Sequence, residues 1–178
     1  MHHEIIIAGF GGQGILSAGR LLAYAGMLDG KEVSWLPSYG PEMRGGTANS
    51  MIVISDDPVA SPIISSCTSL LVMNNPSVSK YESFVEKNGV IVYDSSIITL
   101  VPSRKDVSSF GIPASMLASD MGEMAYSNVF LLGKLISETN CVTFESFEKA
   151  LFGILPKRKH DMIPEEMKVV MIGANYEC

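Results

Sequence analysis

The residues best suited to bind a ligand lie near the start of the chain, where an apolar stretch runs into a glycine-rich turn. Gly9, Gly11 and Gly14 follow the spacing Gly-x-Gly-x-x-Gly. In such a turn, glycines adopt positive φ angles and let the backbone come close to a ligand. The amides at the start of the following helix face a bound anion with the positive end of the helix dipole. The turn is therefore suited to hold a phosphate.

A dinucleotide-binding enzyme needs one more feature, an acidic residue that contacts the ribose roughly 20 residues after the glycines. The second strand is predicted at residues 33–36, and residues 37–39 follow it without an acid. Asp29 and Glu32 come before this strand, where neither reaches a ribose in the usual geometry. The sequence thus argues against an NAD enzyme. The turn alone is equally compatible with close packing of a helix on a strand.

The composition bounds the class of protein. The 178 residues are 47% hydrophobic and 18% charged, as expected for one domain with a sizeable core and some apolar surface for a partner. The net charge of -6 argues against a nucleic-acid partner, which would require a clustered basic footprint. No apolar run reaches the roughly 20 residues of a membrane span, and no signal peptide precedes Glu4. We therefore expect a cytoplasmic protein.

The cysteines and histidines give no indication of a metal site. Cys67, Cys141 and Cys178 are far apart and form no C-x-x-C motif, which is typical of buried or incidental thiols in a reducing compartment. Such scattered thiols do not ligate an iron–sulfur cluster or a structural zinc. The three histidines are expected to be solvated side chains. We predict neither a metal site nor a catalytic residue in this chain.

A second unusual stretch follows the predicted second strand, at residues 37–49. It contains two prolines and three glycines among thirteen residues, so we expect a structured loop rather than a helix or strand. Arg44 beside paired glycines is suited to bidentate recognition of a phosphate or carboxylate, and Tyr39 and Met43 are residue types enriched at interfaces. The alternative is a long connection without a binding role, whose charged residues are only exposed to solvent. The length of the stretch favours a binding or interface loop.

Apolar periodicity divides the rest of the chain into strands and helices. Further strands are predicted at residues 50–55, 70–73, 89–94 and 107–112. Helices are predicted at residues 15–26, 76–88 and 127–138, together with a short helix that ends at 117, one that begins after 143 and one that begins at 164. Asn75 and Thr143 are the expected N-caps of two of these helices. The strand, helix and strand between residues 70 and 94 should form a parallel, right-handed βαβ unit. The pattern predicts one α/β domain over residues 1–178, with a Rossmann-like first βα unit.

Two other polar features have alternative interpretations. Asp94 ends a predicted strand, where an α/β sheet gathers its ligands, but an Asp-Ser-Ser sequence more often begins a turn. The basic segment 156–160 could contact a phosphate or an acidic partner, although a solvated linker is the simpler interpretation.

Four segments together resemble one family. They are residues 7–15, residues 39–49 with their Tyr-Gly-Pro-Glu-Met-Arg-Gly-Gly sequence, residues 111–114 and residues 128–133. This set resembles the gamma subunit of the 2-oxoacid:ferredoxin oxidoreductases, and the similarity is greatest to the gamma chain of the 2-oxoglutarate:acceptor oxidoreductase. It extends from the first strand to the helix near Asn128, and residues 39–49 are its most specific part.

The resemblance implies a supporting subunit of a complex that oxidatively decarboxylates a 2-oxoacid with CoA to acyl-CoA and CO2. For 2-oxoglutarate the product is succinyl-CoA, and electrons pass to ferredoxin or a similar acceptor. In this family the alpha and beta subunits hold thiamine diphosphate with Mg, and iron–sulfur clusters lie on the beta or a delta subunit. The resemblance also implies a mixed, mostly parallel sheet that curls towards a barrel and is covered by helices.

The same resemblance implies roles for named residues. The glycine turn of the family, a candidate to bind a phosphate of CoA, consists of Gly9, Gly11, Gly12, Gln13 and Gly14. The candidates to contact the thiamine-binding subunits are Tyr39, Gly40, Pro41, Glu42, Met43, Arg44, Gly45, Gly46 and Asn49. Within this segment, Arg44 could pair with a partner carboxylate or a ligand phosphate.

Two other functions stay open at this point. A free-standing nucleotide-dependent oxidoreductase would bind NAD(P) or FAD by itself, whereas a nucleotide-sensing module would bind a nucleotide without joining other chains. A subunit would instead be recovered with partner chains and would be inactive alone. An isolated subunit could also form a homodimer, because its apolar interface would be exposed.

Overall fold

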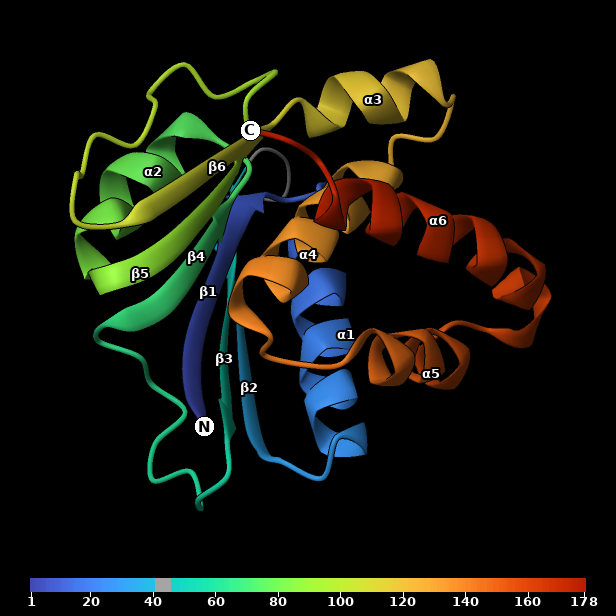
Figure 1. The fold of residues 1–178 in the computed structure, drawn as a ribbon, viewed down its shortest axis with the longest axis horizontal. Coiled ribbons are helices and arrows are strands. Elements are labelled where there is room, and N and C mark those ends of the chain that lie inside the picture. Colours follow the sequence, from blue (N-terminus) through green and yellow to red (C-terminus); the bar gives the residue numbers. More distant parts are fainter. Residues whose placement is uncertain (41–45) are drawn as a thin grey trace.

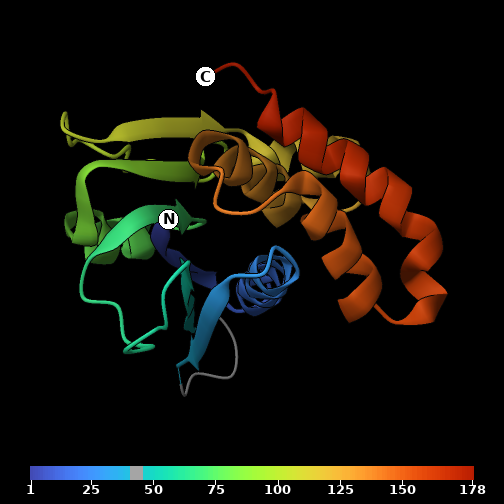
Figure 2. The ribbon, with the colours of Figure 1, turned by 60° about the horizontal axis from the view of Figure 1, so that its bottom comes forward.

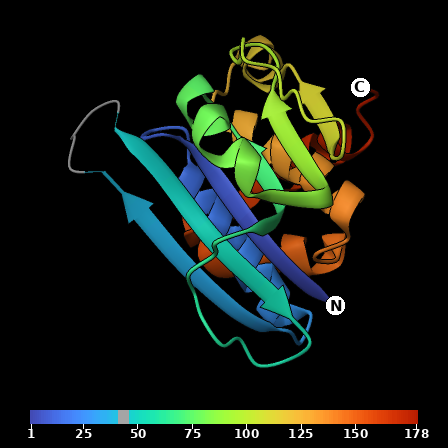
Figure 3. The ribbon, with the colours of Figure 1, turned by 90° about the vertical axis from the view of Figure 1, so that its left-hand side faces the viewer.

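The computed structural model describes residues 1–40 and 46–178, and six strands in this part of the chain form one sheet (Figure 1). The strands are β1 (His2–Phe10), β2 (Glu32–Tyr39), β3 (Thr47–Ser55), β4 (Cys67–Val72), β5 (Val85–Asp94) and β6 (Ser108–Ile112), in the spatial order β2-β3-β1-β4-β5-β6. β1, β4, β5 and β6 run parallel, whereas β3 is antiparallel to β1 and β2. The predicted mixed, mostly parallel sheet is confirmed. The sheet twists, with β2 and β6 at its edges (Figure 3).

The first strand, the glycine turn and helix α1 (Ile15–Leu28) form the predicted βα unit. β2 runs parallel to β1 but does not pair with it, because β3 lies between them and bonds to both. A Rossmann unit places its second strand directly beside the first. The likeness to a Rossmann domain is therefore limited to the strand, the turn and the helix.

Helices cover both faces of the sheet (Figures 1 and 2). Those in the described residues are α1, α2 (Asn75–Tyr81), α3 (Ala114–Asp120), α4 (Tyr126–Thr139), α5 (Phe144–Ile154) and α6 (Ile163–Ala174). α1 and α4 pack on one face, α5 and α6 pack outside them, and α2 covers the other face. Because side chains alternate along a strand, Ile5 and Ile7 of β1 face α1 and α4, while Ile6 faces α2. Burial on both faces explains the unbroken apolar run at the start of the chain.

Short polar side chains fix the starts of two helices. The Thr143 hydroxyl accepts the Ser146 N–H at 3.1 Å, which confirms the predicted cap of α5. The Asn74 side chain accepts the Ser77 N–H at 2.8 Å, so α2 is capped one residue before the predicted Asn75. Each bond satisfies an amide that has no acceptor within its helix.

The end of α2 differs from the prediction. The sequence predicted a helix over 76–88, but α2 ends at Tyr81, and β5 contains both Asn88 and Gly89. The Asn88 N–H donates to the Asp106 carbonyl at 2.7 Å, and a Cβ on Gly89 would lie 2.8 Å from the Thr68 carbonyl oxygen. The pair therefore marks an irregularity in the pairing of β4 and β5 where two backbones come close together.

The predicted loop at residues 37–49 is wrong in part. Residues 37–39 belong to β2 and residues 47–49 belong to β3, with Tyr39 opposite Ala48. Pro37 is tolerated within β2 because this is an edge strand, where a residue without an N–H need not cost a hydrogen bond to a neighbouring strand. Pro41, Glu42, Met43, Arg44 and Gly45 lie outside the described residues.

Helices α4 and α6 touch through two glycines. A Cβ on Gly133 would lie 2.0 Å from the Val170 carbonyl oxygen, and a Cβ on Gly173 would lie 2.0 Å from the Phe130 carbonyl oxygen. Side chains are thus excluded from the contact, and the two backbones approach directly. This contact holds α6 against the core, and α6 contributes Glu166 to the cavity described below.

We expect the Gly133→Ala variant to lower the free energy of unfolding by about 1–3 kcal/mol, because the new methyl group must push two helix backbones apart. Gly153→Ala on α5 is a matched control, since its Cβ would meet only the ring of Tyr24, 2.6 Å away, which can rotate. There the better helix propensity of alanine should leave stability equal or slightly higher. Urea denaturation measures both, and equal stability of the two variants would contradict the close contact.

Candidate functional site

The glycine turn enters α1 through two residues with a left-handed backbone. Gly12 and Gly14 have φ angles of 95° and 75°. Gly14 is the N-cap of α1, without a side-chain cap in the described part of the chain. The N–H groups of Ile15, Leu16 and Ser17 leave the helix end with no acceptor among residues 1–40 and 46–178, and no acidic side chain lies in this first turn. The start of α1 thus offers free donors to an anion.

Packing explains why the turn needs its other glycines. A Cβ on Gly9 would lie 2.6 Å from Gln13 Oε1, and a Cβ on Gly11 would lie 2.1 Å from the Tyr39 hydroxyl. A Cβ on Gly12 would meet nothing within 4 Å. Gly9 and Gly11 therefore make room for side chains, whereas Gly12 faces open space.

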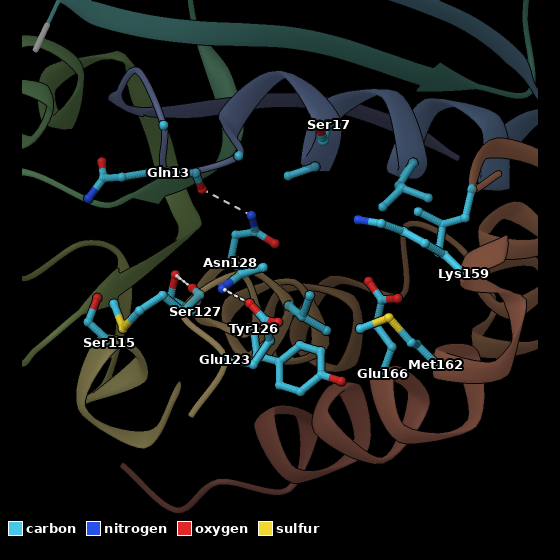
Figure 4. Close-up of a pocket in the computed structure, with 18 residues that line it drawn as sticks. Gln13, Ser17, Ser115, Glu123, Tyr126, Ser127, Asn128, Lys159, Met162 and Glu166 are labelled. Atoms are coloured by element: carbon cyan, nitrogen blue, oxygen red, sulfur yellow. Dashed lines mark hydrogen bonds between the residues drawn. The ribbon is translucent and has the colours of Figure 1, made fainter. Parts of the chain in front are cut away.

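The Gln13 side chain bridges the ends of two neighbouring strands. Its Oε1 accepts the Phe10 N–H at 2.6 Å, and its Nε2 donates to the Met73 carbonyl at 2.9 Å. Phe10 ends β1 and Met73 follows β4, so Gln13 occupies the crevice at the carboxyl ends of these strands, where doubly wound sheets bind their ligands. The Gln13 side chain points away from the neighbouring cavity (Figure 4). Only the backbone of Gln13 is left to contact a ligand there.

A cavity of about 440 Å³ lies between the start of α1, the start of α4 and residues 155–166, which we call the C-terminal segment (Figure 4). Gly12 and Ser17 border it on the α1 side, and Asn128 borders it on the α4 side. A smaller hollow of about 270 Å³ lies on the other side of the turn, next to Tyr39 and Phe10. The larger cavity has the size of a small-molecule site, and Ser17, one of the three residues with a free amide, lies at its edge.

The cavity contains charges of both signs. The side chains of Lys159 and Glu166 point into it from the C-terminal segment (Figure 4). Burial raises the pKa of the Glu166 carboxyl, and the nearby Lys159 partly opposes this shift. Burial also raises the pKa of the Tyr126 hydroxyl, and the Glu166 carboxylate adds to the effect. Backbone amides, a lysine and a neutral phenol are groups that bind a phosphate-bearing ligand.

The two buried cysteines are unsuited to nucleophilic chemistry. Burial raises the pKa of the Cys67 thiol to about 12 and that of the Cys141 thiol to about 11, so both stay protonated at neutral pH. Across residues 1–40 and 46–178, no three His, Cys, Asp or Glu side chains are grouped to hold a metal ion. In the same residues, every helix is too short or too polar to cross a membrane.

Comparison with known proteins decides the family. The model of the family "pyruvate ferredoxin/flavodoxin oxidoreductase" matches residues 4–176. The chain belongs to this family. The resemblance predicted from the glycine turn and residues 39–49 is thereby confirmed.

The chain matches one relative along nearly its whole length and another along only part of its length. The 2-oxoglutarate synthase subunit KorC of Methanocaldococcus jannaschii is 35% identical over 180 residues, and the match covers 99% of this chain and 94% of KorC. The ketoisovalerate oxidoreductase subunit VorA of Methanothermobacter thermautotrophicus is 36% identical over 175 residues, which cover 97% of this chain but 36% of VorA. The chain thus spans about a third of the length of VorA.

Solved structures agree with the family match. The gamma subunit of a keto/oxoacid ferredoxin oxidoreductase from Geobacter sulfurreducens PCA superposes with a TM-score of 0.84 at 29% identity, over 98% of this chain and 97% of that one. A 2-oxoglutarate:ferredoxin oxidoreductase from Magnetococcus marinus shares the fold, with a TM-score of 0.85 at 22% identity over 99% of this chain and 32% of that one. The oxidoreductase-family chain therefore has the gamma-subunit fold.

The described part of the predicted interface segment lies against the glycine turn. Tyr39 ends β2 and is 49% exposed, and the Gly40 N–H donates to the Thr47 carbonyl at 3.1 Å. The buried Gly46 accepts the Gly11 N–H through its carbonyl at 2.9 Å. The two sites that the sequence singled out are thus neighbours in space. Asn49, also predicted at the interface, is half-buried in β3.

Asp94 has a structural role in this fold. Its Oδ1 accepts the N–H and the hydroxyl of Ser96 at 3.1 and 2.6 Å, and its Oδ2 accepts the N–H and the hydroxyl of Ser115 at 3.0 and 2.5 Å. The side chain is fully buried and joins the end of β5 to the start of α3. The turn interpretation of Asp94 is therefore correct.

Several residues of the cavity were missed or undervalued by the sequence analysis. Residues 157–162 form a 3₁₀ segment in which no residue is buried, as expected for a solvated segment, and it brings Lys159 to the cavity. Tyr126, Asn128 and Glu166 reach the same space from two other helices. Asn128 opens one of the segments that resemble the family, but spacing along the chain gives no signal that these groups converge.

We expect the Glu166→Gln variant to be more stable than the natural chain at neutral pH, with the difference vanishing in acid. The pKa of Glu166 is raised by folding, so the unfolded chain releases this proton first as pH rises, and ionisation then costs folding free energy. The difference should appear as pH rises above about 4 and level off above the raised pKa. Urea unfolding from pH 4 to pH 8 measures it. Glu165→Gln is the control, since it loses an exposed pair with Lys168 and should give no gain.

Proposed function

We propose that this chain is the gamma subunit of a multisubunit 2-oxoglutarate:ferredoxin oxidoreductase. The complex oxidatively decarboxylates 2-oxoglutarate with CoA to succinyl-CoA and CO2 and passes electrons to ferredoxin or a similar acceptor. The observation that carries the choice of substrate is the match to KorC along 94% of that subunit, whereas the match to VorA covers 36% of a longer chain. We further propose that residues 1–178 form one gamma-type domain and that the complex is cytoplasmic.

In this proposal the chemistry takes place on other chains. Alpha and beta subunits hold thiamine diphosphate and Mg, and iron–sulfur clusters lie on the beta or a delta subunit. The buried thiols of Cys67 and Cys141 support this division of labour, because protonated thiols are poor nucleophiles and poor metal ligands. The isolated gamma chain is then a binding subunit without activity of its own.

The contribution of this chain is to hold a phosphate of CoA at the start of α1. The N–H groups of Ile15, Leu16 and Ser17 support this role because they have no acceptor in the described residues, and Gly12 supports it because a Cβ there would meet nothing within 4 Å. The adjoining cavity of about 440 Å³ gives room for more of the ligand, and Lys159 adds a cation on its opposite side. CoA is anionic, so the free N–H groups of α1 and the Lys159 ammonium would both attract it.

Residues 39–49 dock the chain on the thiamine-binding subunits in this proposal, with Arg44 paired to an anion there. Exposed apolar side chains along the edge strand β2 support the docking: Trp35, Leu36 and Tyr39 are 36%, 37% and 49% exposed. The bond between Gly11 and Gly46 would then hold the glycine turn next to the partner subunits. Phosphate held at the turn would leave the thiol end of CoA free to reach their reactive centre.

Co-purification from the source cell tests the assignment. A tagged gamma chain should recover two or three further subunits, and the recovered complex should reduce ferredoxin or a viologen dye with 2-oxoglutarate and CoA. The isolated chain should be inactive under the same conditions. A complex that prefers 3-methyl-2-oxobutanoate would overturn the choice of substrate, and a clean monomer that binds NAD(P) or FAD would overturn the subunit assignment.

The Ser17→Asp variant tests the phosphate site within the complex. An aspartate at the third position of α1 favours the helix dipole by about 0.3–1 kcal/mol, so the chain should be equally or more stable. The same carboxylate repels a bound phosphate, and we expect the KM for CoA to rise about tenfold, because one close like charge costs on the order of 1–4 kcal/mol. Ser17→Asn is the isosteric neutral control and should keep the KM near that of the natural complex. Unchanged KM in Ser17→Asp would contradict the site.

A further inference from the structure

Asn128 joins the start of α4 to the glycine turn. It is the third residue of α4, and its Nδ2 donates to the Gln13 carbonyl oxygen at 3.0 Å across 115 positions of the sequence. Room for this contact exists because Gly14 has no side chain: a Cβ there would lie 2.1 Å from Asn128 Nδ2. The left-handed Gly14 and the amide of Asn128 therefore depend on each other.

The acceptor that Asn128 takes is the one that α1 would otherwise use. In a continued α-helix, the Ser17 N–H would donate to the Gln13 carbonyl, four residues earlier. The first helical bond is instead the one from the Ala18 N–H to the Gly14 carbonyl, at 2.9 Å. The Gln13 carbonyl turns to Asn128, and the Ser17 N–H has no acceptor in the described residues. The hydrogen bond from Asn128 to the Gln13 carbonyl and the free Ser17 N–H therefore occur together.

Gln13 is held from both ends by this arrangement. Its side chain bonds to Phe10 and Met73, and its carbonyl bonds to Asn128. Figure 4 shows the Asn128 amide between the turn and the cavity, with its nitrogen directed at Gln13 and its oxygen turned away from the turn. Removal of Asn128 would leave the Gln13 carbonyl without this partner and would give Gly14 room to adopt a helical backbone, in which the Ser17 N–H donates to that carbonyl.

We propose that Asn128 is a positioning residue for the binding of CoA: it keeps the Gln13 carbonyl out of α1 and so leaves the Ser17 amide free for a phosphate. The proposal rests on the proposed phosphate site at the start of α1. It assigns Asn128 no contact with the reacting atoms. Its effect should therefore appear in the binding of phosphate-bearing substrates and not in the chemical step.

The test uses the assembled complex with Asn128→Ala or Asn128→Leu in the gamma chain. Both remove the donor, and leucine also keeps most of the volume. Pantetheine, a thiol acceptor without phosphate, is assayed beside CoA. We expect the KM for CoA to rise about tenfold, the scale of one hydrogen bond to a charged group, with kcat and the kcat/KM for pantetheine within about twofold of the natural complex. Ser137→Ala is the matched control, because it removes a hydroxyl that bonds backbone carbonyls at the far end of α4.

Each other outcome has a defined meaning. An unchanged KM for CoA in both Asn128 variants overturns the proposal, and so does an equal loss with CoA and pantetheine, which indicates general damage to the complex. Failure of both variants to assemble overturns it as well, because Asn128 would then serve the fold. If Ser17→Asp raises the KM for CoA and the Asn128 variants do not, only the role of Asn128 fails. If Ser17→Asp also leaves the KM unchanged, the phosphate site itself fails.

Discussion

The hydrogen bonds made by Gln13 are the constraint on which the rest of the site depends. They join the end of β1, the end of β4 and the start of α4 to a single residue of the turn. In a doubly wound sheet this crevice is open to a ligand, but here a side chain of the protein fills it. Of the three residues with free amides, Ser17 borders the cavity between α1 and α4, whereas Ile15 and Leu16 border the smaller hollow next to Tyr39.

The order of the strands has a second consequence. Because β3 lies between β1 and β2, β3 begins beside the end of β1, where Gly46 bonds to Gly11. A Rossmann order would have placed β2 beside β1 instead. The proposed ligand site and the proposed docking site are therefore neighbours, which suits a subunit that presents a substrate to chemistry on another chain. Close helix contact at Gly133 and Gly173 completes the arrangement by fixing α6, which carries Glu166.

Local chemistry made much of the fold predictable. Glycine spacing predicted the turn, Thr143 predicted the start of α5, and apolar runs predicted the buried strands. The errors arose where one residue type serves two structures. Asn88-Gly89 ends helices often, but here it allows close approach of two strands, and Pro37 suits an edge strand as well as a loop. Such cases are decided by neighbours distant in the sequence, which spacing does not reveal.

The sequence by itself determined the turn, the class of fold and the family resemblance, because these depend on residue type and short-range spacing. It also indicated that the chain lacks its own redox centre, since its cysteines are scattered. Only the tertiary structure decided that Gln13 fills the crevice, that Asn128 holds its carbonyl, and that Lys159 reaches the same cavity. The hydrogen bonds of Gln13 join residues up to 115 positions apart, and they exist only once the sheet order and the helix packing have brought distant segments together.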